Sequence, residues 1–300
     1  MALPLWAWAG LAAALAQTGR NAAQSGLTAR LGTLGATNVR FLFGLPFAAL
    51  FLWLALMWSG EPLPALTLRT IGFTAMGSLA QIAATALMLQ VMRTQGFGIT
   101  TAWLKVEPVL VALVGWAMLG DPLTAPMLGA IGVAVVGVLI LTLKPGAGRA
   151  MLTGLGPATM GLLAGLAFGM AAIGFRGGIT ALPEGGFLVR SLTTLVLSLA
   201  IQTGVLGLWL ALRDRPALAG SLREWLPSLA AGFLGALASA FWFIAFSLTS
   251  AANVRTLALA EVVFALAVAR FAFRQRVTPR QMAGIGVLLL GVALLMRVSP

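Results

Sequence analysis

The sequence contains neither cysteine nor histidine, and it has few charged residues. Without cysteine the chain can form no disulfide and offers no thiolate. Without histidine it lacks an imidazole base and the most common metal ligand. Asp121 and Asp214 are the only aspartates, and both are predicted to lie in loops, which excludes a membrane aspartyl pair. We therefore expect no metal, no cofactor and no enzymatic activity.

Apolar residues make up most of the sequence. The 300 residues are 60% hydrophobic and 9% charged, whereas a soluble domain carries about 25% charged residues. Apolar stretches of about 20 residues recur along the chain, as expected for membrane-spanning helices. We expect an all-α, multi-pass integral protein of the bacterial inner membrane. The net charge of +12 is interpreted as loop charge facing anionic lipid and not as a nucleic-acid interface.

Charged residues and turn formers divide the apolar sequence into ten predicted helices. They cover residues 4–27, 34–57, 68–92, 97–119, 124–143, 151–177, 186–211, 225–248, 252–273 and 278–297. The connections are short, so consecutive helices should be antiparallel. The midpoint predicts a division into a first five-helix unit, residues 1–147, and a second, residues 148–300.

One motif occurs twice at an offset of 154 positions, in residues 107–137 and 261–291. The aligned identities are Glu107 with Glu261, Thr124 with Thr278, Ile131 with Ile285, Gly132 with Gly286 and Gly137 with Gly291. Because each half has an odd number of helices, the second half enters the membrane from the opposite side, so the repeats are inverted. Inverted repeats predict a substrate site near the bilayer midplane and alternating access around it.

The first copy reads E-P-x-x-x-A-L-x-G-W-x-x-L-G-D-x-L-T and is followed by a helix punctuated by glycine. This segment resembles the helix 4–5 region of the EamA family in the drug/metabolite transporter superfamily. The second copy departs from that pattern, with Val262 in place of proline and 274–276 in place of the glycine-acid segment. The resemblance implies a secondary transporter, most often an exporter of amino acids or similar small metabolites. It also implies a central cavity lined by helices 1, 3, 4, 6, 8 and 9.

Polar side chains inside predicted spans are the candidate substrate-binding residues, because charge at bilayer depth is costly. They are Arg20, Asn21, Gln81, Trp103, Glu107, Arg176, Trp242 and Glu261. Asn21 and Trp242 match positions at which the resembled family carries a polar and an aromatic residue. For the two glutamates, binding a substrate ammonium, carrying a proton and pairing with a fixed arginine all remain open. A cavity with arginine and glutamate would suit a zwitterion.

Other polar residues are predicted to have structural roles. Arg40 and Arg190 begin predicted helices and are expected to anchor them at the headgroups. Asn253 and Arg255 are expected to cap the ninth helix. Gly161, Gly165 and Gly169 are spaced four apart, which favours close approach of a neighbouring helix.

Loop charge and the resemblance predict opposite orientations. Most arginines and lysines lie in the loops after helices 1, 3, 5, 7 and 9, so the positive-inside rule places both termini outside the cytoplasm. The resemblance implies cytoplasmic termini. A cationic-drug exporter and a non-transporting receptor or assembly subunit remain alternative functions. Expected partners are a small-molecule substrate and membrane lipid, but no nucleic acid, and the protein is expected to be a monomer or homodimer.

Overall fold

The computed structural model describes residues 3–95, 107–142, 155–271 and 278–298. Every regular element within these ranges is an α-helix, and they contain no β-strand. The prediction of an all-α chain is therefore confirmed for the part of the sequence that the structure describes.

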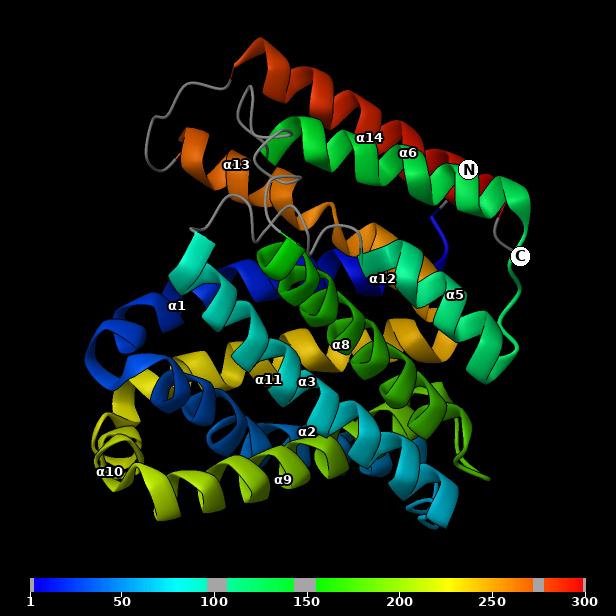
Figure 1. Cartoon of the computed structure of the whole chain (residues 1–300). Helices are drawn as coiled ribbons and strands as arrows, with labels where there is room; N and C mark the ends of the chain where they lie inside the picture. The colour runs from blue at the N-terminus through cyan, green and yellow to red at the C-terminus, as the bar shows by residue number, and fades with distance from the viewer. Residues whose placement is uncertain (1–2, 96–106, 143–154, 272–277, 299–300) are drawn as a thin grey trace. The chain divides into compact units, whose positions relative to one another are not determined.

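The helices follow one another along the chain as Figure 1 shows. They are α1 (Leu5–Leu42), α2 (Gly44–Ser59), α3 (Leu68–Gln95), α5 (Glu107–Leu119), α6 (Ala125–Thr142), α8 (Leu155–Thr180), α9 (Phe187–Arg213), α10 (Arg215–Arg223), α11 (Trp225–Leu248), α12 (Ala251–Ala258), α13 (Glu261–Phe271) and α14 (Pro279–Val298).

Six described segments are long and apolar enough to cross a membrane. They are Leu34–Ser59, Leu68–Leu87, Thr159–Thr180, Phe187–Arg213, Trp225–Leu248 and Pro279–Val298. The helices α5 and α6 are apolar but shorter. These segments identify a multi-pass integral membrane protein.

The predicted number of ten helices is not confirmed, because three boundaries differ. The predicted break at 28–33 is present as a kink at Gly32, whose φ of +66° and ψ of 177° are not helical, so two helical segments meet there within α1. Only glycine adopts such a φ at little cost, so the kink needs no loop. A boundary that was not predicted separates α1 from α2 at Phe43, where φ and ψ stay in the right-handed helical region.

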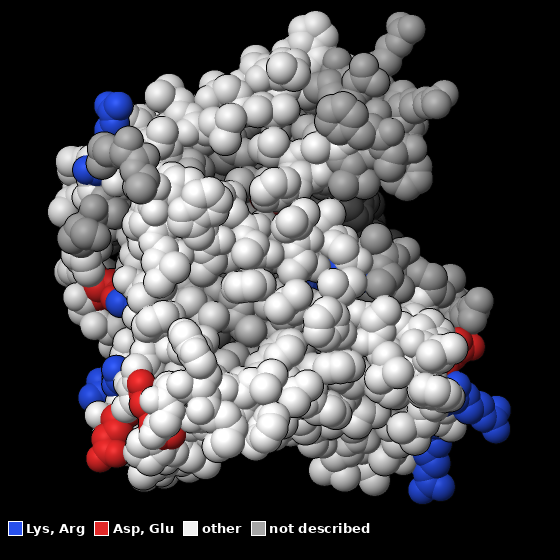
Figure 2. Space-filling view, turned by 180° about the vertical axis from the view of Figure 1, so that it is seen from behind, with Lys and Arg blue, Asp and Glu red and all other residues white. Residues whose placement is uncertain are grey.

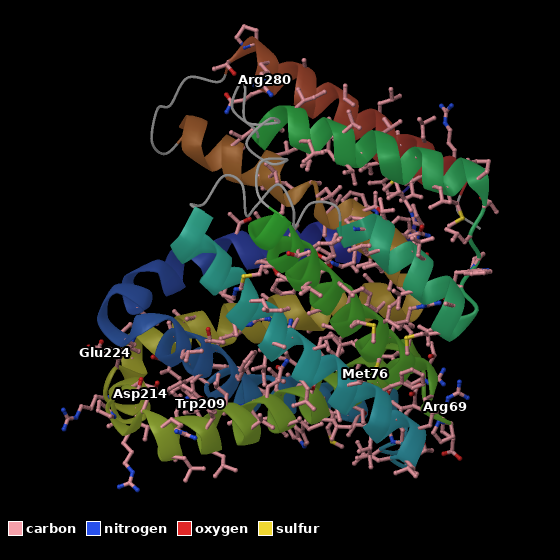
Figure 3. All side chains as sticks on the ribbon, viewed as in Figure 1. Arg69, Met76, Trp209, Asp214, Glu224 and Arg280 are labelled. Atoms are coloured by element: carbon pink, nitrogen blue, oxygen red, sulfur yellow. The ribbon has the colours of Figure 1, made fainter. Side chains whose placement is uncertain are left out.

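The other two differences lie in the second half. The predicted loop after residue 211 contains the short helix α10, whose ends carry Asp214 and Glu224 (Figure 3). The Asp214 carboxylate accepts a hydrogen bond from the Ala217 amide at 3.1 Å, which caps the helix. The predicted ninth helix, 252–273, is divided into α12 and α13.

The chain forms two compact units that do not follow its two halves. Unit 1 consists of residues 1–79 and 174–249, and unit 2 of residues 80–173 and 250–300. Each unit therefore combines elements from before and after the predicted midpoint. The boundary between sequence repeats at 147–148 stays a prediction.

Glycine allows helices in unit 1 to approach one another closely. A Cβ on Gly232 of α11 would lie 2.6 Å from the Phe43 Cβ, and one on Gly174 of α8 would lie 2.6 Å from the Gly77 Cα in α3. No real side chain fits in these positions. The helices therefore pack through their backbones, as small residues permit in membranes.

Unit 2 contains a reciprocal contact between α6 and α14. A Cβ on Gly137 would overlap the Leu288 backbone, and a Cβ on Gly291 would overlap the Ala134 backbone. At the offset of 154, Gly137 is equivalent to Gly291 and Ala134 to Leu288. The same two equivalent positions thus make the same contact in both directions, which is the pattern of a two-fold axis.

The direction of these two helices follows from a further contact. A Cβ on Gly284 would lie 2.8 Å from the Leu141 Cβ. Positions along α14 therefore rise as positions along α6 fall, so the helices are antiparallel neighbours (Figure 1).

Large apolar side chains are widely exposed, as expected for helices that face lipid. Trp58 is 81% exposed, Leu68 86% and Leu212 70%. On the face shown in Figure 2, uncharged atoms dominate and the charged side chains form a few separate groups. A surface of this kind suits a hydrocarbon environment.

Candidate functional site

Arg255 and Glu261 stand on either side of a break in one predicted helix. The helix α12 ends before Leu259, and α13 begins at Glu261. The amides of Leu259 and Ala260 bond to carbonyls three residues earlier, which tightens the backbone at the break. Arg255 lies near the C-terminus of α12 and Glu261 at the N-terminus of α13. Each charge therefore complements the dipole of its own helix end.

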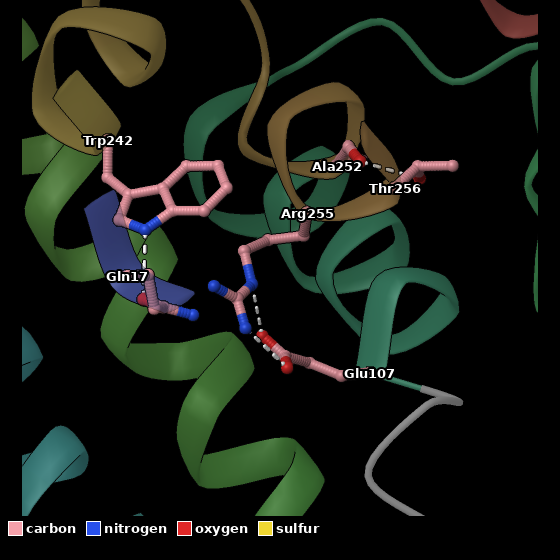
Figure 4. A network of polar contacts seen from close by, with 6 residues as sticks. All are labelled: Gln17, Glu107, Trp242, Ala252, Arg255 and Thr256. Carbon is pink, nitrogen blue, oxygen red and sulfur yellow. Dashed lines mark hydrogen bonds and ion pairs between the residues drawn. The ribbon is translucent and has the colours of Figure 1, made fainter. Parts of the chain in front are cut away.

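Glu107 and Arg255 form a two-pronged ion pair within unit 2. Arg255 Nε donates to Glu107 Oε1 at 2.6 Å, and an Nη of Arg255 donates to Oε2 at 2.7 Å (Figure 4). The partners are 148 residues apart in the chain. The Glu107 side chain is 7% exposed and that of Arg255 25% exposed. Both carboxylate oxygens are thus engaged by one planar guanidinium, the geometry in which such pairs are strongest.

The ion pair shows that Arg255 does not cap its helix, and it identifies an arginine partner for Glu107. Arg255 was expected to cap the ninth helix, but Ser250 does so, since its hydroxyl accepts from the Asn253 amide at 3.3 Å. Arg255 instead supplies the arginine partner that was one of the possibilities for Glu107. The sequence holds a signal for it, because Arg255 lies six positions before Glu261, the repeat equivalent of Glu107.

Glu261 is half-buried and contributes electrostatically to the same cluster. Its carboxylate acts favourably on Arg255, in addition to the ion pair with Glu107. Glu107 and Glu261 lie on α5 and α13. The two repeat-equivalent glutamates therefore act on the same guanidinium.

In unit 1 the candidate Trp242 is held by a polar residue of α1. Its indole Nε1 donates to the Gln17 side-chain oxygen at 3.1 Å (Figure 4). Trp242 is 6% exposed and lies on α11. The hydrogen bond satisfies the one donor of a buried indole and fixes the ring against α1.

Arg20 and Arg40 occupy the same face of unit 1. Arg20 is 8% exposed and Arg40 is half-buried. A Cβ on Gly235 of α11 would lie 3.3 Å from Arg40 Cγ and 3.5 Å from Arg20 Cδ. The expectation that Arg40 anchors a helix start at the headgroups stays a prediction, and the structure adds that the Arg40 side chain lies beside Gly235 of α11. Asn21 lies on the same helix as Arg20.

Arg176 caps the end of a helix and does not extend toward an interface. Its guanidinium donates to the Phe246 carbonyl at 2.6 Å and also to the Thr249 carbonyl. Both carbonyls belong to the C-terminal end of α11, which attracts a cation. Arg190 similarly donates to the carbonyls of Thr180 and Leu182 beside the start of α9, and its expected role at the headgroups stays a prediction.

The remaining candidates are placed as follows. Gln81 is half-buried on α3, where its carbonyl accepts from the Thr85 hydroxyl at 2.8 Å. Trp103 lies outside the described residues. Gly169 lies in van der Waals range of Val111, since its Cβ would be 3.1 Å from Val111 Cγ2. Among the described residues, no group of three or more potential ligands could hold a metal ion.

Comparison with known proteins supports the assignment that the motif suggests. Residues 156–297 match the EamA-like transporter family. No functionally curated protein matches the chain. A protein of known crystal structure is 14% identical, and the match covers 98% of this chain and 96% of that one with a TM-score of 0.73. At this identity the likeness shows the fold alone. Over residues 156–297, slightly less than half of the chain, the sequence is therefore similar to the EamA-like transporter family, which supports the resemblance carried by the motif.

Proposed function

We propose that the chain is a secondary transporter that exports amino acids or similar small metabolites across the bacterial inner membrane by alternating access. The observation that carries this proposal is the ion pair between Glu107 and Arg255. It connects a residue of the first predicted repeat with one of the second. A contact of this kind can form in one access state and open in the other, as bistable interfaces do in transport cycles.

The packing of α6 on α14 supports the inverted arrangement that the proposal needs. Equivalent positions of two antiparallel helices contact each other reciprocally, as with Gly137 on Leu288 and Gly291 on Ala134. A two-fold axis perpendicular to two membrane-crossing helices lies in the plane of the membrane. This is the symmetry of inverted-repeat transporters, whose two halves exchange roles between the two access states.

The break between α12 and α13 supports a binding role for its surroundings. Discontinuous helices in transporters expose backbone and helix ends to a polar site near the midplane. Here Arg255 and Glu261 flank the break, and Glu107 reaches it from α5. We propose that these carboxylates exchange their contact with Arg255 for contact with a substrate ammonium during the cycle. Arg20, Asn21, Gln81, Trp103 and Trp242 are proposed as further substrate contacts, whereas Arg176 is proposed to hold α11.

The test is uptake of labelled solutes by proteoliposomes that contain the purified chain. The panel should include neutral, acidic and basic amino acids and one lipophilic cationic dye, with protein-free liposomes as the control. Saturable, protein-dependent uptake of an amino acid is expected. Uptake restricted to the cationic dye would replace the metabolite assignment by drug export. Absence of protein-dependent flux for the whole panel, in preparations that retain helical circular dichroism, would favour a receptor or assembly subunit.

A further inference from the structure

Two arginines converge on one glycine inside unit 1. Gly235 lies near the middle of α11 (Trp225–Leu248), and a Cβ there would touch Arg40 Cγ at 3.3 Å and Arg20 Cδ at 3.5 Å. Both arginine side chains therefore pass directly beside Gly235. A methyl group at this position would contact both of them and would require a small shift of Arg40.

The two guanidinium groups repel each other in this arrangement. Arg20 and Arg40 carry like charges beside the same glycine, and Arg40 is half-buried. Arg40 Nε is buried and has no hydrogen-bond partner among the described residues. A donor left in this state costs free energy unless an acceptor arrives. Like charges brought together at membrane depth make the arrangement more costly still.

The acidic residues of unit 1 lie outside its membrane-spanning segments. Glu61 and Glu184 are in connections between helices, and Asp214 and Glu224 are at the ends of α10. Glu61 accepts from the Gly186 amide at 2.7 Å, and Asp214 caps α10. No carboxylate of unit 1 therefore stands within a span, whereas Arg20 and Arg40 lie in α1 beside α11.

We propose that Arg20 and Arg40 form a dibasic site for the anionic group of the transported solute, with a dicarboxylate as the preferred class. The proposal rests on the transport function proposed above and deepens it. Guanidinium groups bind carboxylate through paired N–H donors, and two of them match two negative charges. Arg40 is thereby assigned a binding role. A lipophilic cation is disfavoured as a ligand of this site.

Binding is tested on the purified full chain in neutral detergent, by the shift in apparent melting temperature. Succinate is the probe, and succinamide, which has the same carbon skeleton and no charge, is its control. Succinate should raise the melting temperature saturably and succinamide should not. Arg20→Gln and Arg40→Gln should each weaken the succinate affinity at least tenfold, whereas Arg297→Gln on exposed α14 should leave it unchanged. Equal shifts with both probes, or wild-type affinity in Arg40→Gln, would overturn the proposal.

A second pair of variants retains the charges of Arg20 and Arg40. These variants keep the proposal testable if the arginine variants fail to fold. Gly235→Ala inserts a methyl group against both arginine side chains and should weaken succinate binding severalfold. Gly207→Ala in α9 is the control, since its Cβ would meet nothing within 4 Å. Wild-type succinate affinity in Gly235→Ala, or equal weakening in both alanine variants, would count against the site.

Two further experiments distinguish a solute site at Arg20 and Arg40 from a lipid site and from the transport function itself. Phosphatidylglycerol in place of succinate tests a lipid headgroup as the source of the anion. A shift that depends on Arg40 with the lipid but not with succinate would overturn the solute site. Proteoliposome flux separates the site from the function. Binding of succinate without flux of any solute would refute transport but retain the site, whereas flux of neutral solutes without Arg40-dependent succinate binding would refute the site alone.

Discussion

Both carboxylate oxygens of Glu107 accept hydrogen bonds from the Arg255 guanidinium, at 2.6 and 2.7 Å. The carboxylate belongs to α5 and the guanidinium lies near the end of α12, so the pair joins two helices that are distant in the sequence. The side chain of Glu107 is nearly inaccessible. Removing either partner alone would leave the other charge without its main counter-charge in an apolar setting.

This relationship predicts non-additive stability. Glu107→Gln and Arg255→Gln should each lower the free energy of unfolding by on the order of 3 kcal/mol, because each leaves a desolvated charge behind. The double variant, which carries neither charge, should recover most of that loss. Thermal unfolding of the four detergent-purified proteins measures the cycle. Additive losses in the double variant would show that the two residues contribute independently.

The reciprocal packing of α6 on α14 predicts a sharp contrast between glycines. Gly137→Ala and Gly291→Ala should each destabilise the chain by about 1–3 kcal/mol, because the methyl group would overlap the facing backbone. Gly132→Ala and Gly286→Ala are matched controls at another aligned pair, where a Cβ meets nothing within 4 Å. These two should be neutral or slightly stabilising, since alanine favours a helix over glycine. Equal effects on unfolding temperature in all four variants would contradict the close contact.

Arg176 is predicted to act on stability more than on substrate affinity. Its guanidinium donates to the Phe246 and Thr249 carbonyls at the end of α11. Arg176→Gln should therefore cost about 1–2 kcal/mol through lost charge-assisted hydrogen bonds. The Michaelis constant for uptake should change less than twofold. Unchanged stability combined with a large rise in the Michaelis constant would instead assign Arg176 to substrate binding.

Orientation is testable by reporter fusion. The positive charge of the loops that follow the first, third, fifth, seventh and ninth of the ten predicted helices predicts that both termini face away from the cytoplasm. Alkaline phosphatase fused after Pro300 should then be active, and green fluorescent protein fused there should be dark. The reverse pair of results would favour the cytoplasmic termini that the EamA resemblance implies.

Much of this arrangement is encoded locally, and the exceptions have physical causes. The apolar composition predicts the helical membrane fold, and the repeat predicts the equivalence of Glu107 and Glu261. The break after α12 was not predicted, because its apolar residues satisfy a helical pattern and the interruption consists of shifted backbone hydrogen bonds. The partnership of Glu107 with Arg255 depends on tertiary contact between helices 148 residues apart, which a single sequence does not encode by spacing.

The environment of Arg40 is a second feature that could not be predicted from the sequence alone. An arginine near a helix start usually extends to the headgroups, so the sequence favoured an anchoring role. The structure places the Arg40 side chain beside Gly235 of α11, a contact between helices that are distant in the sequence. The sequence pattern around Arg40 alone does not reveal such a contact.

The most direct test of the central claim is solute uptake by proteoliposomes that contain the double variant Glu107→Gln/Arg255→Gln, compared with wild-type protein at equal reconstitution. This variant should be nearly as stable as the wild type but should transport at less than a tenth of its rate, because the exchangeable ion pair between the two repeats is gone. Wild-type uptake by the double variant would contradict the claim and would reduce the ion pair to a structural contact.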